Sequence, residues 1–210
     1  MKSHICAALL LIAMPAAADQ PKRLFYDVEN QTYGHIGTYS LAIETRNGAT
    51  LITSEAHIRV DVLGVTMFRQ EAARHERWVG SRLVEFHGVT TENDVPVKID
   101  GHADGDHFVL TSPSGETKLP GSIRPASPLV ADGGGGPIFM TDTGTVTAGK
   151  VEDLGEMTIS FAGAPTKAHR YRIETTGARE KYEVWMGADR TPLRFTSADA
   201  RSNSTFTLVP

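Results

Sequence analysis

Apolar residues recur at every second position along most of this chain, and this period of two limits the fold more than any other feature. Tyr39, Leu41 and Ile43 alternate with small or polar residues. Side chains of a β-strand point to opposite faces in turn, so this pattern predicts strands with one buried and one wetted face. The same alternation is found in the sets Ile58–Val60–Val62, Met157–Ile159–Phe161, Tyr171–Ile173, Tyr182–Val184–Met186, Leu193–Phe195 and Phe206–Leu208.

Turn residues separate these segments at short intervals. Asn47-Gly48 is the dipeptide that most favours a tight type I′ hairpin, and further Gly, Pro, Asn and Asp clusters follow it. Such frequent punctuation leaves no room for long helices, and no amphipathic helical pattern is present after the N-terminal segment. The sequence predicts an all-β, mainly antiparallel fold.

Residues 120–140, PGSIRPASPLVADGGGGPIFM, interrupt the alternation. This segment holds four prolines and five glycines, so no strand can run through it unbroken. We expect a long surface loop here, dividing the sheet into two halves. Residues 19–210 are otherwise expected to form a single β domain, since roughly 190 residues can bury a sufficient core.

The first eighteen residues have the pattern of a secretory signal. Lys2 precedes a short apolar run, Pro15 ends that run, and Ala16-Ala17-Ala18 fits a signal peptidase site before Asp19. The pattern predicts export, with a periplasmic mature protein that is not transmembrane. The single cysteine, Cys6, lies inside this signal, so the mature chain is expected to have neither disulfide nor thiolate metal ligand.

The charges argue against nucleic acid as a partner. The chain has 21 Lys and Arg against 25 Asp and Glu, a net charge of −4, and the charges are scattered rather than gathered in blocks. Binding to nucleic acid or to an anionic lipid surface needs a concentrated basic patch.

One short motif, GHADGDH at residues 101–107, resembles the zinc-ligand run of metallo-β-lactamases. His102, Asp104, Asp106 and His107 are therefore candidate metal ligands. That run, however, leads into a helix, whereas here the strand-like FVL follows. Asp104-Gly105 between two alternating segments favours a hairpin turn instead, and we expect no metal or cofactor.

A second candidate is the pair Glu55 and His57, which share one strand face and could act as acid and base. A solvated strand surface explains the same pair more simply. No Gly-x-Ser-x-Gly motif is present to indicate a serine nucleophile.

Large aromatic residues are distributed over many of the expected strands, on both faces. Core packing accounts for most apolar stripes, but a curved sheet with a concave groove would also use residues in this way. The candidate ligand-groove residues are Phe68, Trp78, Phe86, Phe161, Tyr182, Trp185 and Phe195.

Three stretches carry a resemblance to a known group of proteins: YDVENQTYGHIGTYSLAI, IRVDVLGVTMFRQEAARHERWVGSRLVEF and YEVWMGADRTPLRFTSADARSNSTFTL. They resemble an exported Gram-negative bacterial family of unknown function, distantly similar to the periplasmic lipoprotein carriers. The resemblance implies a half-barrel or β-spiral sheet and a periplasmic location, and it brings no catalytic residues.

Three functions are compatible with these observations. The first is a non-enzymatic periplasmic protein that binds a lipid or another apolar small molecule in a β groove, for envelope maintenance or transport. The second is an interaction module that docks onto an envelope protein through strand edges or the Gly-rich loop. The third is an enzyme, either a metal-dependent hydrolase at GHADGDH or an acid–base enzyme at Glu55 and His57.

Overall fold

A computed structural model describes residues 20–130, 135–176, 181–198 and 203–210. Within these ranges fifteen strands form one sheet, accompanied by a single 3-10 turn, η1 (Pro128–Val130), and no α-helix. The all-β prediction is confirmed. The strands are β1 (Lys22–Asn30), β2 (Gly34–Arg46), β3 (Ala49–Val62), β4 (Val65–Val79), β5 (Arg82–Glu92), β6 (Val95–Asp104), β7 (His107–Ser112), β8 (Gly115–Pro120), β9 (Arg124–Pro125), β10 (Gly136–Phe139), β11 (Val146–Phe161), β12 (Ala164–Thr175), β13 (Lys181–Met186), β14 (Pro192–Ala198) and β15 (Asn203–Leu208).

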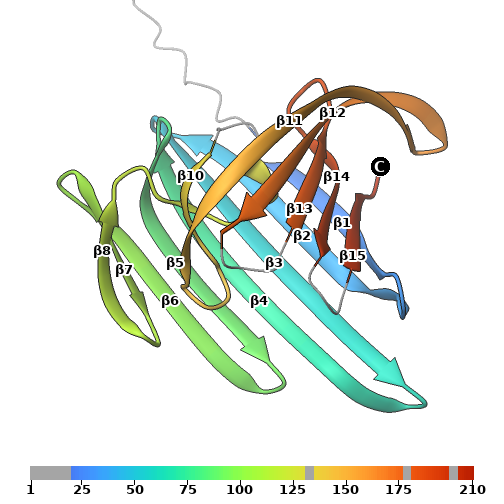
Figure 1. Ribbon diagram of the computed structural model, residues 1–210, viewed down its shortest axis with the longest axis horizontal. Helices are drawn as coiled ribbons and strands as arrows, with labels where there is room; N and C mark the ends of the chain where they lie inside the picture. The colour runs from blue at the N-terminus through green and yellow to red at the C-terminus, as the bar shows by residue number, and fades with distance from the viewer. Residues whose placement is uncertain (1–19, 131–134, 177–180, 199–202) are drawn as a thin grey trace, which may run out of the picture.

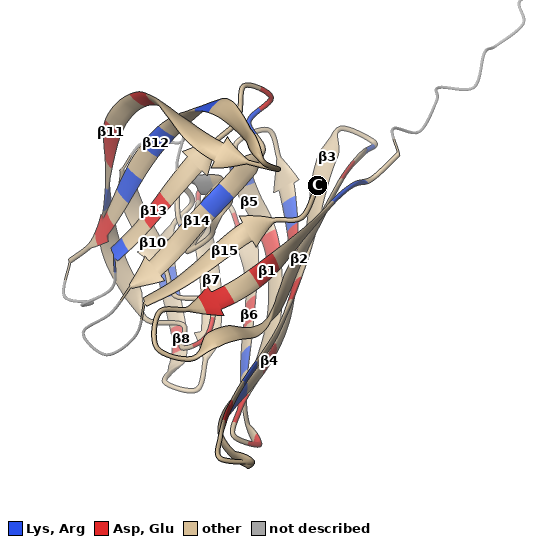
Figure 2. Cartoon of the chain, turned by 90° about the vertical axis from the view of Figure 1, so that its right-hand side faces the viewer, with Lys and Arg blue, Asp and Glu red and all other residues tan. Residues whose placement is uncertain are grey.

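The strand order makes the sheet barrel-like but not closed (Figures 1 and 2). Strands β1 to β8 follow one another outward from β1, and β15 back to β9 do the same on its other side. The first and last strands therefore pair at the middle of the sheet. Its two edges, β8 and β9, are consecutive in the chain and joined by residues 121–123. Every pair is antiparallel except β9–β10. The expected strongly curved, mainly antiparallel sheet is confirmed.

Several hairpins turn through two residues with positive φ, as a type I′ turn requires. Asn47 and Gly48, at φ 52° and 74°, connect β2 to β3 as the sequence predicts. Leu63 and Gly64 connect β3 to β4 at φ 51° and 81°. The same turn type thus forms with and without a favourable first residue.

Shifts of register bend the strands and change which side chains face inward. One shift between Val60 and Asp61 puts an extra residue into β4. Val62, expected on the buried face with Ile58 and Val60, is exposed; it is the last residue of β3, next to the Leu63-Gly64 turn. Further shifts lie at Val28/Glu29, Arg77/Trp78, Asp153/Glu156 and Trp185/Met186.

The core is divided into separate clusters inside the curved sheet. The largest joins the inner faces of β1–β4 to those of β12–β14 and includes Tyr26, Tyr39 and Phe195. A second cluster fills the inner side of β5–β8 around Phe86 and Phe108. Both are assembled from alternate residues of antiparallel strands, which is how the period of two becomes a buried face.

In its described parts, residues 120–130 and 135–140, the segment 120–140 is not an irregular surface loop, and the prediction is wrong for these residues. Residues 131–134 lie outside the description, but on either side of them the segment forms β9, η1 and β10. Ile123 and Phe139 are buried in the second cluster, and the Phe139 ring lies 4.9 Å from that of Phe86. Apolar residues between the Gly and Pro positions pack in the core. The free energy gained by burying them outweighs the low strand propensity of the Gly and Pro residues.

Residues 1–18, where a signal sequence is expected, lie outside the described residues. In the part of the chain that is described, no helix has the length and apolar character needed to cross a membrane. Basic and acidic residues are spread over the strands visible in Figure 2, in keeping with the scattered charges of the sequence.

Candidate ligand-binding site

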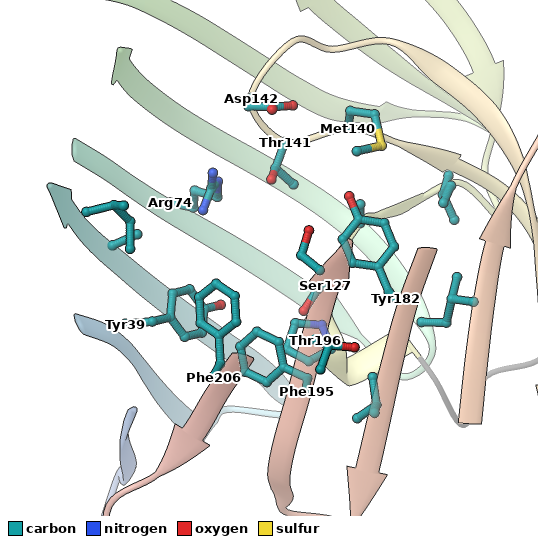
Figure 3. A pocket seen from close by; sticks show the side chains of 18 of the residues that line it. Tyr39, Arg74, Ser127, Met140, Thr141, Asp142, Tyr182, Phe195, Thr196 and Phe206 are labelled. Atoms are coloured by element: carbon teal, nitrogen blue, oxygen red, sulfur yellow. The ribbon is translucent and has the colours of Figure 1, made fainter. Parts of the chain in front are cut away.

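A half-enclosed cavity of about 250 Å³ lies inside the curved sheet (Figure 3). Strands β2–β4 form one wall, strands β12–β15 form another, and residues of the segments 126–128 and 138–142 form a third. The lining residues are Tyr39, Ala56, Ile58, Gln70, Arg74, Ala126, Ser127, Pro128, Ile138, Met140, Thr141, Asp142, Ile173, Tyr182, Val184, Phe195, Thr196, Ser197 and Phe206.

One end of this cavity is aromatic. Phe195 on β14 is the direct cross-strand partner of Phe206 on β15, and their rings stack at 4.3 Å. The Tyr39 ring contacts both edge-on, at 5.6 and 5.8 Å. Burial raises the pKa of Tyr39 to about 12, so its hydroxyl stays neutral at physiological pH. The three packed rings therefore give this end of the cavity a rigid apolar surface.

The other end is polar. Arg74 of β4, Thr141 and Asp142 lie away from the three rings in Figure 3. The Arg74 Nη2 donates to Thr90 Oγ1 at 3.4 Å. The Arg74 Nε and the Asp142 Oδ1 are buried, and neither has a hydrogen-bond partner among the described residues. Buried polar atoms normally have a partner, so these two atoms mark the polar end as a place where a ligand can bind.

A buried carboxylic acid lies beside this end, two residues from Arg74 on the same face of β4. Glu76 is 7% exposed and accepts a hydrogen bond from Trp78 Nε1 at 2.8 Å. Burial raises the pKa of Glu76 to about 7, against the opposing effects of the Trp78 hydrogen bond and the Arg74 charge. The inner face of β4 therefore carries both a cation and a titratable acid.

The seven candidate groove residues are divided among several places. Tyr182 and Phe195 line the cavity. Phe68 packs on the largest core cluster beyond it. Trp78 and the buried Phe86 belong to the second cluster, and Phe161 and Trp185 to a small third cluster around Ile159.

Trp185 also shows which face of its strand is wetted. Its neighbours Val184 and Met186 are buried. The Trp185 indole is covered by the Arg170 guanidinium at 5.3 Å and donates to Met157 Sδ at 3.2 Å. The tryptophan thus lies on the face opposite the cavity, as its position out of phase with Tyr182 predicts.

The GHADGDH residues form a hairpin between β6 and β7, as predicted, but its two turn residues are Gly105-Asp106 and not Asp104-Gly105. Asp104 pairs across the strands with His107, and Gly105, at φ 53°, begins the turn. Lys118 Nζ lies 3.4 Å from Asp104 Oδ2. Nowhere in the described part of the chain do three or more His, Cys, Asp or Glu residues lie in positions that could hold a metal ion.

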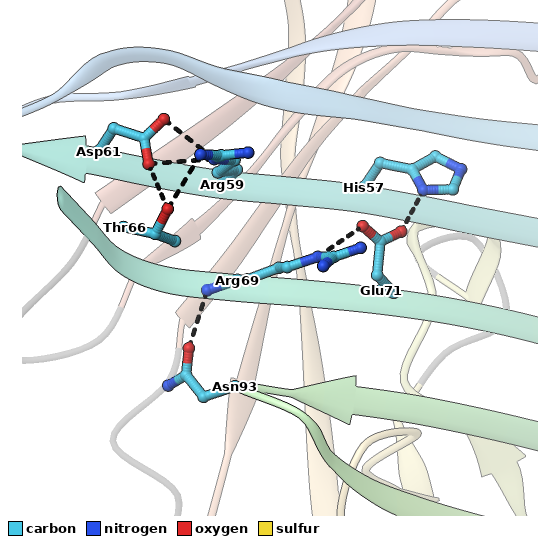
Figure 4. A network of polar contacts seen from close by, with 7 residues as sticks. All are labelled: His57, Arg59, Asp61, Thr66, Arg69, Glu71 and Asn93. Carbon is cyan, nitrogen blue, oxygen red and sulfur yellow. Dashed lines mark hydrogen bonds and ion pairs between the residues drawn. The ribbon is translucent and has the colours of Figure 1, made fainter. Parts of the chain in front are cut away.

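Glu55 and His57 lie on the exposed outer face of β3. The His57 Nδ1 contacts Glu71 on β4, and Arg69 Nε donates to the same carboxylate at 3.3 Å (Figure 4). These contacts lower the pKa of Glu71, with the His57 hydrogen bond as the larger lowering cause. The network is solvated, and exposed ion pairs contribute little to stability.

Arg74 and Asp142 were not among the site residues predicted from the sequence. A charged residue in an alternating segment is expected on the wetted face, yet Arg74 shares its parity with Phe68 and Trp78. Those two aromatic residues at the ends of β4 are the signal that could have placed the arginine on the inner face.

The comparisons with known proteins agree with this fold. A family model described as "Domain of unknown function (DUF6134)" matches residues 26–209. A crystal structure of a β-barrel-like protein of another domain of unknown function, DUF1849, from Brucella abortus superposes with a TM-score of 0.68. That similarity covers 90% of this chain and 95% of the other at 13% identity, so it concerns the fold alone. No relative is found among curated proteins.

Proposed function

The chain belongs to the DUF6134 family, and we propose that it is a non-enzymatic binding protein that holds a lipid or another apolar small molecule inside its curved sheet. The observation that carries the proposal is the half-enclosed cavity whose walls include residues of eight strands and whose aromatic end is made by Tyr39, Phe195 and Phe206. Concave, mostly apolar sites with a few polar groups are the usual form of small-molecule binding sites.

The volume of the cavity limits what it can hold. At about 250 Å³ it lies below the ~300–1,000 Å³ of pockets that enclose drug-sized ligands. A single hydrocarbon chain fits this description better than a two-chain lipid. Burial of such a chain supplies on the order of 25 cal/mol per Å² of apolar area, and no catalytic group is needed.

We also propose that the protein works in the periplasm of a Gram-negative cell, in envelope maintenance or transport. The support is the signal-like pattern of residues 1–18, with a small-residue site before Asp19. Intact-mass measurement on protein from a periplasmic extract tests this: the proposal requires a chain that begins near Asp19, and a full-length chain retained in the cytoplasm contradicts it.

Binding can be tested with N-phenyl-1-naphthylamine, an uncharged fluorophore that brightens in apolar surroundings. Protein freed of lipid by organic extraction and refolding is titrated with the probe. Ala56 lines the cavity from β3, so Ala56→Phe fills part of the space. We expect this variant to bind the probe at least about tenfold more weakly.

A matched control separates filling of the cavity from added aromatic surface. Ala73, on the neighbouring strand, is exposed on the outer face. Ala73→Phe is expected to bind the probe like the parent protein. Overpacking a core position costs about 1–3 kcal/mol, so the folding of both variants must be checked. Thermal unfolding makes this check. If the parent protein gives no saturable increase in probe fluorescence, the proposed function is contradicted.

A further inference from the structure

Arg74 is a cation inside the sheet that the protein leaves largely unpaired. The strand β4 alternates so that Gln70, Ala72, Arg74 and Glu76 face inward, and Arg74 reaches the cavity wall (Figure 3). Its hydrogen bond to Thr90 Oγ1 is long, at 3.4 Å, and its buried Nε has no partner. No salt bridge to this guanidinium is found in the described part of the chain.

An arginine in this position is costly unless something compensates its charge. Removing a guanidinium from water is unfavourable, and a buried donor without an acceptor adds to the cost. The Arg74 charge acts on the Glu76 carboxyl group at a distance, but no hydrogen bond or salt bridge joins the two among the described residues: Glu76 accepts from Trp78 Nε1 and lies outside the cavity lining. The unmet donor of Arg74 is therefore available to a ligand in the cavity.

The two ends of the cavity correspond to the two ends of an amphiphile. Arg74, Thr141 and Asp142 lie apart from the ring cluster of Phe195 and Phe206 (Figure 3). A planar guanidinium offers paired donors in the geometry that a carboxylate accepts, and such charge-assisted bonds are stronger than neutral ones. An apolar chain can then run from the guanidinium onto the rings.

The acidic group at the polar end restricts the charge of the head group. Asp142 lines the same cavity, and its buried Oδ1 has no partner among the described residues. A second negative charge on the ligand would be repelled by this carboxylate. A head with one negative charge is therefore favoured over a doubly charged phosphate monoester.

We propose that Arg74 anchors the carboxylate of a single-chain amphiphile, such as a medium-chain fatty acid, whose hydrocarbon chain lies against Tyr39, Phe195 and Phe206. This inference rests on the proposed function and names the ligand class of the same cavity. Arg74 selects the head group, and the aromatic end supplies most of the affinity without regard to charge.

Decanoate and decan-1-ol test the inference because they share a chain and differ in the head. Each compound is titrated at pH 7 against parent protein loaded with N-phenyl-1-naphthylamine, and displacement of the probe is measured. We expect decanoate to act at a concentration about tenfold lower than decan-1-ol, as one charge-assisted hydrogen bond predicts. Arg74→Gln abolishes this preference by weakening decanoate alone. Arg77→Gln, which removes an exposed arginine of the same strand, leaves the preference intact.

Failure of the inference differs from failure of the proposed function. Equal displacement by the two compounds, or a preference that survives Arg74→Gln, overturns the role of Arg74 while apolar binding stands. Absence of probe binding by the parent protein overturns both. The comparison on the parent protein needs no variant. If Arg74→Gln does not fold, Arg74→Met replaces it: this variant removes the charge but keeps a long, flexible side chain, so it must lose the preference for decanoate, and a preference that survives contradicts the inference.

Discussion

Glu76 makes the stability of this protein depend on pH in a defined direction. Its pKa is about 7 in the folded protein, where burial raises it from the ordinary value of 4.5. Between these two values the folded chain holds a proton that the unfolded chain has released, so the free energy of unfolding falls as pH rises from about 4.5 to 7. The full effect is on the order of 3 kcal/mol.

Glu76→Gln is expected to remove this dependence, because the amide stays neutral and can still accept from Trp78. Urea unfolding at pH 5 and pH 8 measures it: the variant should gain stability relative to the parent protein as pH rises. Glu85→Gln, on the exposed outer face of β5, controls for the lost charge. A constant difference between variant and parent at both pH values would contradict the account.

Gly101 is a residue whose lack of a side chain the core requires. A Cβ at this position would lie 2.3 Å from the Phe108 ring. Phe108 is fully buried and packs near Phe139, so its ring cannot easily move. Gly101→Ala is expected to cost about 1–3 kcal/mol in chemical denaturation. Adding Phe108→Leu should recover part of that loss, and strictly additive losses would argue against this contact.

At the scale of elements, the β3–β4 hairpin turns through a residue that resists its conformation. Leu63 is fully exposed at φ 51°, so its side chain contributes no burial, yet it occupies a region that disfavours branched side chains. Leu63→Asn is expected to stabilise the protein by about 0.5–1 kcal/mol. The matched reverse change is Asn47→Leu at φ 52°, which should destabilise to a similar extent. Thermal unfolding of both variants measures the two changes in stability. If both variants were stabilised, or both destabilised, this explanation would be contradicted.

These two turns also show how far the sequence predicts the elements. Asn47-Gly48 identifies its hairpin because both residues tolerate positive φ, whereas Leu63-Gly64 forms the same turn with only its glycine as a signal. Alternation of apolar residues identified β2, β3 and β11–β15, because this pattern is also a local property of the chain. The course of residues 120–140 was mispredicted, because Gly and Pro report local flexibility and not the burial of Ile123 and Phe139.

The pairing that joins the two arms of the sheet, β1–β8 and β9–β15, depends on contacts that no local pattern encodes. Strand β1 pairs with β15 through Tyr26↔Leu208 to Asn30↔Ser204, across nearly the full chain. Arg74 and Asp142 likewise become neighbours of one cavity only when the two arms of the sheet meet. Tyr182 and Phe195 were predicted as site residues, but separating them from the other aromatic candidates required this three-dimensional arrangement.

Removal of residues 203–210 tests the central pairing. It exposes the edges of β1 and β14 and takes Phe206 from the cavity. Unpaired central edges favour association with other chains. We expect a lower unfolding temperature and oligomers in size-exclusion chromatography, whereas removal of the exposed Pro210 alone should change neither. A monomeric truncated protein of unchanged stability would contradict the pairing of β1 with β15.

The measurement that tests the binding account most directly is a methyl NMR titration of Ile- and Met-labelled protein with decanoate. Ile58, Ile138, Ile173 and Met140 line the cavity, whereas Ile99 and Ile123 lie in the second core cluster. The account predicts saturable shifts of the first four methyl signals and little change in the other two. Shifts confined to methyls outside the cavity, or no saturable shifts at all, would contradict it.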